Sequence, residues 1–240
     1  MSVRASAAME DFGGAASGRS GECGYGLWRK LVNLAAAALV ALAVSDAASA
    51  APTRIVAFGD SLTAGYGVAP EEAFPARLQG WLHDHGIEAE VVNAGVSGDT
   101  SAGGLARLDW TLAEPADAVL VEFGANDALR AVDPQSTYEN LDAILSKLEA
   151  RRVKVLLLGM ESPANWGPEY QRSFNAIYPA LAERHHVLLY PFFLQGVALD
   201  PSLNQPDMLH PNARGVDTIV ARVGPYVLRL LGASAPGGSG

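Results

Sequence analysis

The sequence predicts an α/β domain in which a central parallel sheet of about five strands lies between two layers of helices. Short apolar runs alternate with amphipathic stretches along the chain, the order expected of strand–helix–strand units. The run at 54–59 is continuous rather than alternating, which is typical of a strand that is buried on both faces. About 190 residues follow the N-terminal region, enough for one compact domain.

The first half of the chain supplies three of the predicted strands. The run at 54–59 is almost wholly apolar, and the stretch 71–85 carries its large apolar residues at helical spacing before Gly86. Two further stretches, 88–93 and 117–123, are predicted as strands. Between them a glycine-bearing loop leads into a helix at about residue 100.

The second half supplies the remaining two strands. The stretch 134–151 begins with Asp133-Pro134, a favourable N-cap and first-turn pair, and is predicted as a helix. Strands at 153–159 and 187–190 flank a helix at 170–184, and a helix at 212–231 closes the domain.

Residues 1–50 are predicted to be an extension and signal peptide. A basic pair, Arg29-Lys30, precedes fourteen residues, Leu31–Val44, that are apolar except for one asparagine, and Ala48-Ser49-Ala50 resembles a signal-peptidase site. The apolar run is shorter than the ~20 residues that span a bilayer, so we expect cleavage after Ala50 and no stable membrane insertion afterwards. An uncleaved N-terminal anchor is the alternative.

The protein is therefore expected to be periplasmic or secreted, with a catalytic domain at 51–231 and a disordered tail at 232–240. The only cysteine, Cys23, lies within 1–50, so the exported chain would contain no disulfide.

The charge of the chain excludes two classes of partner. The formal net charge is −9, and the four basic and four acidic residues within 1–50 cancel, so residues 51–240 carry the same net charge. Nucleic acid and anionic lipid both require a basic surface. We expect neither as a partner.

Four polar segments follow predicted strands. Ser61 follows the first strand, Gly98 the second and Asn126 the third, while Asp207 and His210 come after the fifth. The carboxyl ends of parallel strands meet at one edge of a sheet, which is where ligands bind. We expect these residues to be neighbours.

The residue types indicate nucleophilic catalysis. Ser61 is the predicted nucleophile, His210 the general base, and Asp207, three residues earlier, the acid that orients the imidazole. Asn204 and Asp200 are alternative partners for His210 but lack that spacing. Taken singly, Ser61 and Asp207 also suit turns or helix caps.

Two further residues are predicted to stabilise an oxyanion. The backbone N–H of Gly98 lies near a predicted helix N-terminus, and Asn126 offers its side-chain amide. An ordinary strand-to-helix turn is the alternative for each loop. Metal-ligand and phosphate-binding motifs are missing from the sequence, so we predict neither a metal nor an organic cofactor.

Taken in order, the four segments resemble the GDSL or SGNH hydrolase family. The resemblance rests on four motifs that span most of residues 53–231: Gly59-Asp60-Ser61-Leu62, Gly98 within Val96–Thr100, Gly124-Ala125-Asn126-Asp127, and Asp207-Met208-Leu209-His210. It implies a flavodoxin-like three-layer α/β/α SGNH hydrolase fold, a Ser61–His210–Asp207 triad, and an oxyanion hole of Ser61, Gly98 and Asn126.

The resemblance also implies a reaction, the hydrolysis of carboxylic esters and acyl thioesters through an acyl-serine. The activity would be of the arylesterase, acyl-CoA thioesterase or lysophospholipase type, on a small-molecule substrate, by a monomer without a cofactor. The alternatives are a carbohydrate acetylesterase of the same family and an exported binding protein with an unreactive serine.

Overall fold

The computed structural model describes residues 52–233, which contain one five-stranded, all-parallel sheet. The strand order is β2-β1-β3-β4-β5. Its strands are β1 (Thr53–Gly59), β2 (Ala89–Gly95), β3 (Ala118–Glu122), β4 (Lys154–Leu158) and β5 (Leu188–Tyr190). The predicted signal peptide with Cys23, and the tail from 234 onward, lie outside the described residues.

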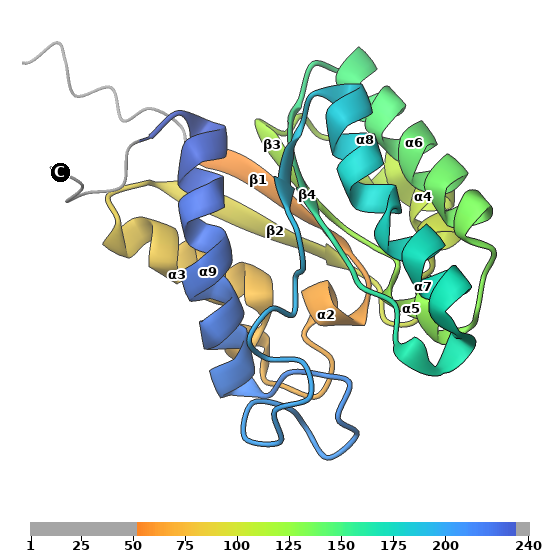
Figure 1. Ribbon diagram of the computed structural model, residues 1–240. Helices are drawn as coiled ribbons and strands as arrows, with labels where there is room; N and C mark the ends of the chain where they lie inside the picture. Colours follow the sequence, from red (N-terminus) through yellow and green to blue (C-terminus); the bar gives the residue numbers. More distant parts are fainter. Residues whose placement is uncertain (1–51, 234–240) are drawn as a thin grey trace, which may run out of the picture. The chain divides into compact units, whose positions relative to one another are not determined.

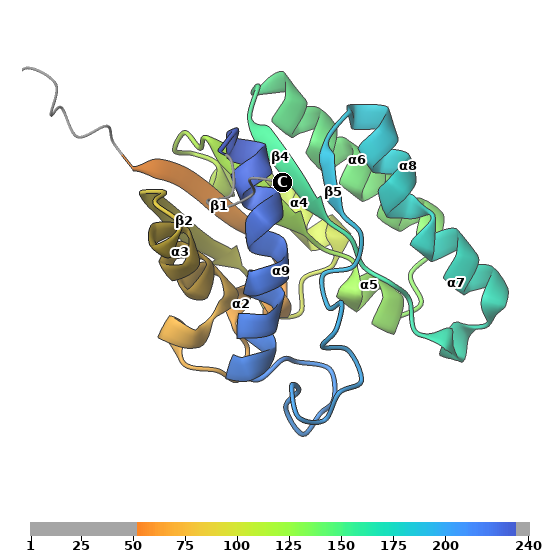
Figure 2. The same ribbon diagram turned by 60° about the vertical axis from the view of Figure 1, so that its left-hand side comes forward.

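Helices cover both faces of the sheet, which confirms the predicted three-layer fold (Figure 1). One face carries α3 (Phe74–Asp84) and α9 (Ala213–Leu231), which pack against each other. The other carries α4 (Ser101–Thr111), α6 (Pro134–Ala150) and α8 (Ile177–His185), and the turned view separates the two layers clearly (Figure 2).

The contact between α3 and α9 requires a small residue. A Cβ on Gly224 of α9 would lie 2.6 Å from the indole of Trp81 on α3, so only glycine permits this approach.

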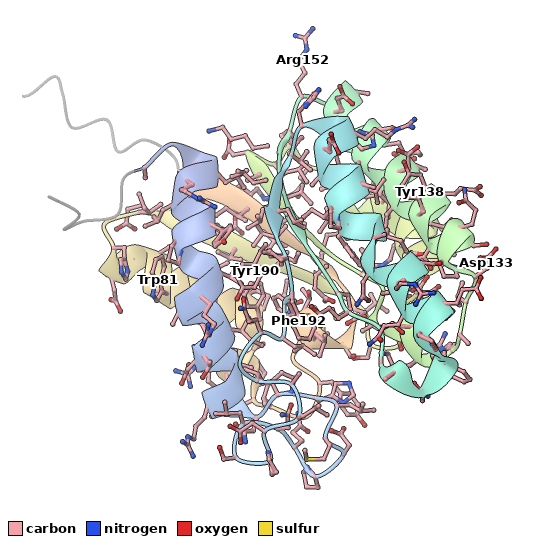
Figure 3. All side chains as sticks on the ribbon, in the orientation of Figure 1. Trp81, Asp133, Tyr138, Arg152, Tyr190 and Phe192 are labelled. Atoms are coloured by element: carbon pink, nitrogen blue, oxygen red, sulfur yellow. The ribbon has the colours of Figure 1, made fainter. Side chains whose placement is uncertain are left out.

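Helix α9 also contacts the last strand of the sheet. Tyr190 at the end of β5 packs edge-on against Tyr226 of α9, with 5.0 Å between the ring centroids. Both Trp81 and Tyr190 lie beside α9 in Figure 3.

The core is made by the strands that the sequence predicts. Ile55–Phe58 of β1, Ala118–Val121 of β3 and Leu156–Leu158 of β4 are all buried. Their side chains on both faces meet helices, which explains why these runs are continuously apolar. Glu122, the last residue of β3, is the exception, because it is an acidic residue that is fully buried.

The chain changes direction across the sheet between β1 and β3. After β2 pairs on one side of β1, β3 pairs on the other side, so Gly59 lies opposite both Gly95 and Glu122. This order creates a switch point at the carboxyl ends of β1 and β3, the usual position of a binding crevice in open α/β sheets. The segments that contain Ser61 and Asn126 begin there.

The structure corrects the prediction of a single helix at 170–184. The region forms two helices, α7 (Pro168–Asn175) and α8 (Ile177–His185), joined at Ala176. Pro179 explains the break, because proline has no N–H to donate to the carbonyl of Asn175 and its ring crowds that carbonyl.

Several short elements were not predicted. Two short helices, α2 (Ser61–Ala64) and α5 (Ala125–Leu129), occupy segments expected to be turns, and 3₁₀ turns form at Pro70–Glu72 and Ala164–Trp166. Helix α3 begins at Phe74 rather than 71, with Pro75 in its first turn. Within residues 52–233 no helix has the length and apolar character needed to cross a bilayer.

Candidate active site

Ser61, His210 and Asp207 form one hydrogen-bonded chain. The Oγ atom of Ser61 lies 3.0 Å from Nε2 of His210, and Nδ1 of His210 lies 2.7 Å from Oδ2 of Asp207. The short contact between Nδ1 and a carboxylate requires a proton on Nδ1. Nε2 is then the acceptor that faces the serine hydroxyl.

Asp207 is held by the turn that it begins. Its Oδ1 accepts from the backbone N–H groups of Leu209 and His210, while Oδ2 faces the imidazole. The N–H of His210, then its ring, and the N–H of Leu209 hold the pKa of Asp207 at about 2, below its ordinary value. The turn role and the orienting role therefore occur together, and the residue is an anion at neutral pH.

The local structure around Ser61 depends on a glycine. Ser61 is the first residue of α2, with Asp60 as the N-cap, and its residue surface is only 8% exposed. A Cβ on Gly59 would lie 2.2 Å from Oγ1 of Thr63 and 2.5 Å from Oε2 of Glu122. Only glycine lets the end of β1 pass this close to α2 and β3.

Gly98 lies in a loop whose conformation favours glycine. Its φ angle is +86°, in the left-handed region, and its carbonyl accepts from the guanidinium of Arg130 at 3.0 Å. Thr100 caps α4, so the cap role considered for this loop is also present. Arg107 joins the loop to β1 by contacting Oδ2 of Asp99 at 2.7 Å and the carbonyl of Gly59 at 2.8 Å.

Asn126 lies in the first turn of α5. Its Nδ2 donates to Oδ2 of Asp60 at 3.0 Å, which brings the amide next to the residue that precedes Ser61. Among the hydrogen bonds of residues 52–233, the N–H groups of Ser61 and Gly98 have no acceptor. The N–H groups of Ser61 and Gly98 and the second hydrogen of the Asn126 amide are therefore free to donate to a ligand.

A buried network holds the two donor loops together. Asp127, next to Asn126, accepts from the N–H of Ser101 at 2.8 Å and from the hydroxyl of Ser101 at 2.5 Å. It also accepts from Thr137 Oγ1 at 3.2 Å. Asp127 therefore ties the start of α4, which follows the Gly98 loop, to α5 and α6.

The alternative partners for His210 have other roles. The amide of Asn204 donates to the carbonyls of Val197 and Asp200, and the carboxylate of Asp200 accepts from Ser202. Of the other histidines, His185 has a side chain that is only 5% exposed, with Nε2 2.8 Å from Oδ1 of Asp142.

Sequence reasoning missed several residues that shape the site. Tyr66 packs against His210, and Gln205 donates to the carbonyls of Tyr66 and Pro211. Asp60 and Glu122 are fully buried beside Ser61. Glu122 could have been found, since it is an acidic residue inside an apolar strand, and Asp60 adjoins the predicted nucleophile. No local pattern marks Tyr66 or Gln205.

A hollow of about 640 Å³ lies among α6, α7 and α8 and contains none of the five predicted site residues. Two of its aromatic residues contact the segment after Asn126, where Trp166 donates to the carbonyl of Ala128 and Tyr170 to that of Val132. The candidate site is therefore defined by the hydrogen bonds among Ser61, His210 and Asp207 rather than by this hollow.

Comparisons with known proteins agree with this geometry. The model of the GDSL-like Lipase/Acylhydrolase family matches residues 57–217. The chain is 41% identical to Esterase TesA of Pseudomonas aeruginosa, over 80% of this chain and 96% of that protein. It is 44% identical to Thioesterase 1/protease 1/lysophospholipase L1 of Escherichia coli K12, over 69% of this chain and 78% of that protein.

A solved structure gives the same result. The chain is similar to AlinE4, an SGNH-hydrolase family esterase, with a TM-score of 0.65 and 45% identity over 77% of this chain and 99% of that one. Family match, identity and coverage together show that the chain belongs to the GDSL-like lipase/acylhydrolase family and is an ester hydrolase.

Proposed function

We propose that the protein hydrolyses carboxylic esters and acyl thioesters with Ser61 as nucleophile, His210 as general base and Asp207 as the orienting acid. The main support for this proposal is a chain of two hydrogen bonds. Ser61 Oγ lies 3.0 Å from His210 Nε2, and His210 Nδ1 lies 2.7 Å from Asp207 Oδ2. These distances are within the range for proton transfer from a hydroxyl to a base.

The reaction proceeds in two halves. In the first, Ser61 Oγ adds to the carbonyl carbon while its proton passes to Nε2 of His210, and the imidazolium is stabilised by Asp207. The tetrahedral oxyanion accepts hydrogen bonds from the N–H groups of Ser61 and Gly98 and from the amide of Asn126. Cleavage of the acyl–oxygen or acyl–sulfur bond returns the proton from Nε2 to the leaving alcohol or thiol.

The second half regenerates the enzyme. Water adds to the acyl-serine carbonyl and gives a proton to Nε2 of His210. Collapse of this second tetrahedral intermediate releases the carboxylic acid and returns the proton to Ser61 Oγ. Every proton and electron pair is accounted for by substrate, water and these side chains.

Exposed apolar side chains near the site support an apolar acyl or aryl group on the substrate. Each belongs to a loop or short helix that carries a site residue or packs on one: Tyr66, Val96, Leu129, Met208 and Leu209. An apolar group that covers these side chains removes their surface from water, which favours binding.

Labelling with a fluorophosphonate tests the assignment of the nucleophile. We expect one adduct per chain, on a peptide that contains Ser61, and no adduct in Ser61→Ala. Labelling that persists in a folded Ser61→Ala protein would exclude Ser61.

A substrate series tests the reaction class. We expect turnover of p-nitrophenyl esters from acetate to palmitate and of acyl-CoA thioesters to exceed turnover of acetylated xylan. A preference for acetylated xylan would favour the carbohydrate acetylesterase alternative.

The remaining proposals concern location and assembly. Export is supported by Arg29-Lys30, the apolar run Leu31–Val44 and the small-residue site at 48–50, and the catalytic domain is proposed to extend over 51–231 as a monomer. N-terminal sequencing of protein from a periplasmic extract should begin at Ala51, and light scattering should give the mass of one chain. An unprocessed N-terminus or a dimer mass would overturn the respective proposal.

A further inference from the structure

Asp60 is a buried carboxylate that the proposed reaction does not use. It is 0% exposed and lies between β1 and the nucleophile. Each of its oxygens accepts one hydrogen bond: Oδ1 from the N–H of Leu62 at 3.0 Å and Oδ2 from Nδ2 of Asn126 at 3.0 Å. The first bond caps α2, and the second joins Asp60 to α5, the short helix that follows β3.

The second bond restricts the amide of Asn126. A primary amide is planar and has two N–H bonds in fixed directions, so an acceptor on one of them sets the plane and the direction of the other. Without an acceptor, the amide could rotate about its last side-chain bond, a torsion with a broad energy profile. Donors aligned before the reaction stabilise an oxyanion without reorganisation.

We propose that Asp60 is a positioning residue of the oxyanion hole: it accepts one amide hydrogen of Asn126 and thereby directs the other toward the oxyanion. This inference rests on the proposed function and extends it to a residue that does not touch the substrate. Asp60 acts through Asn126, so its effect should disappear when Asn126 is absent.

A second buried carboxyl group, that of Glu122, holds the backbone of Asp60 in place. Oε2 of Glu122 accepts from the hydroxyl of Thr63 at 2.8 Å and from the N–H of Asp60 at 3.3 Å. Oε1 of Glu122 has no hydrogen-bond partner among the described residues. Glu122 therefore fixes the backbone at Asp60, while one of its oxygens has no donor to stabilise a negative charge.

The pKa values of the two carboxyl groups are both raised, for related causes. Burial, with the neighbouring Asp60 charge as the next cause, raises the pKa of Glu122 well above its ordinary value. Burial raises the pKa of Asp60 only to about 6, because Leu62, Asn126 and Glu122 donate to or stabilise its charged form. Asp60, which faces Asn126, therefore ionises at lower pH than Glu122.

Substitution of Asp60 by asparagine should disrupt this relationship. Leu62 and Asn126 donate to different oxygens of Asp60, and asparagine places an NH₂ group at one of those two positions, so one of the two donors loses its acceptor there. Asp60→Ser provides a second variant, because serine keeps a good N-cap for α2 but is too short to reach Asn126.

The experiment is a double-mutant cycle on the full chain, with kcat and KM measured for p-nitrophenyl butyrate. We expect Asp60→Asn and Asp60→Ser each to lower kcat by roughly ten- to a hundredfold, part of the ~10²–10³ that one oxyanion donor contributes. KM should change less than about threefold. Asp60→Asn combined with Asn126→Ala should lie within about threefold of Asn126→Ala alone.

Asp133→Asn is the matched control. Asp133 caps α6 in the same way, since its Oδ1 accepts from the N–H of Gln135, two residues later. In Figure 3 Asp133 lies at the outer edge of the molecule at the start of α6. Its substitution should leave kcat within about twofold of wild type, which separates loss of a cap from loss of Asn126 alignment.

The outcomes distinguish this inference from the proposed function. Losses that multiply in the double variant, or a folded Asp60→Asn and Asp60→Ser with wild-type kcat, would overturn the role of Asp60 and leave the triad intact. An Asn126→Ala protein with wild-type kcat would overturn the oxyanion hole and Asp60 with it. Loss of fluorophosphonate labelling in Asp60→Ser would place its effect on Ser61 instead.

Discussion

The ring of Tyr66 lies against the imidazole of His210, with 4.6 Å between the ring centroids and a tilt of 42° between the planes. The same two segments are joined through Gln205, whose Nε2 donates to the carbonyl of Tyr66 at 2.7 Å and whose N–H donates to the carbonyl of His210 at 2.8 Å. The loop after α2, which contains Tyr66, therefore packs against the imidazole of His210 and supports its position.

This contact predicts that Tyr66→Ala lowers kcat while Tyr66→Phe does not. An aromatic pair contributes about 0.5–1.5 kcal/mol, so loss of the ring should cost roughly two- to twelvefold if it aligns His210. Steady-state kinetics on a short-chain ester would measure the effect. Equal kcat values for the alanine and phenylalanine variants would show that the ring only covers the surface.

Ser61→Ala should abolish turnover. Removal of the nucleophile of a serine hydrolase costs roughly 10⁶-fold in kcat, because the acyl-enzyme can no longer form. Ester hydrolysis should be followed with freshly purified protein, with circular dichroism to confirm folding. Wild-type turnover by the folded variant would exclude the mechanism.

Asn126→Ala should reduce kcat by roughly 10²–10³ with little change in KM, as expected for one oxyanion donor. The amide of Asn126 donates its hydrogen bond to the oxyanion of the tetrahedral intermediate rather than to the bound substrate, so its loss affects kcat more than KM. Kinetics with a long and a short acyl chain would separate this effect from a change in the acyl site. A loss below threefold would mean that Asn126 is only a turn residue.

Asp207→Asn should lower kcat by about 10⁴, the scale seen when an orienting carboxylate becomes an amide and favours the wrong imidazole tautomer. A stability signature should accompany it. The pKa of Asp207 is held at about 2, so its contribution to stability is present above its ordinary value near 3.8 and lost as the pH falls toward 2. The Tm difference between wild type and Asp207→Asn should narrow over that acidic range. A Tm difference that does not depend on pH would contradict the depressed pKa.

Glu122→Gln should raise Tm at pH 8. Burial raises the pKa of Glu122, so the stability that its carboxyl contributes is complete below the unfolded value of about 4.3 and is lost as the pH rises through the folded pKa. Glutamine keeps an acceptor for Thr63 and does not ionise. Thermal unfolding from pH 4.5 to 8 should show a gain that grows with pH, whereas a variant less stable than wild type at pH 8 would indicate an ionised, stabilised Glu122.

Most of the sheet could be predicted from the sequence because its strands are buried on both faces. A run such as Ala118–Val121 is apolar throughout, and no tertiary information is needed to recognise it. The helix pair at 168–185 was predicted as one helix because helical spacing continues across Ala176. Pro179 marks the break, but the same residue would be tolerated in the first turn of a helix.

The short helices illustrate a different limit. Four residues in α2 and five in α5 are too few to create a periodic pattern, and isolated helices of this length are unstable. They form because tertiary neighbours hold them, such as Glu122 beside Thr63 and Asp60 beside Asn126.

The sequence by itself determined the layered fold, the five strands, and the five residues that carry the proposed chemistry, because burial and nucleophilic catalysis each restrict residue type locally. Only the tertiary structure decided that Asp60 reaches Asn126, that Glu122 lies behind them, and that Tyr66 packs on His210. Those partners are 66, 62 and 144 residues apart in the chain. Their contacts arise from strand order and from the close approach that glycine permits at the end of β1, and neither leaves a periodic trace in the sequence.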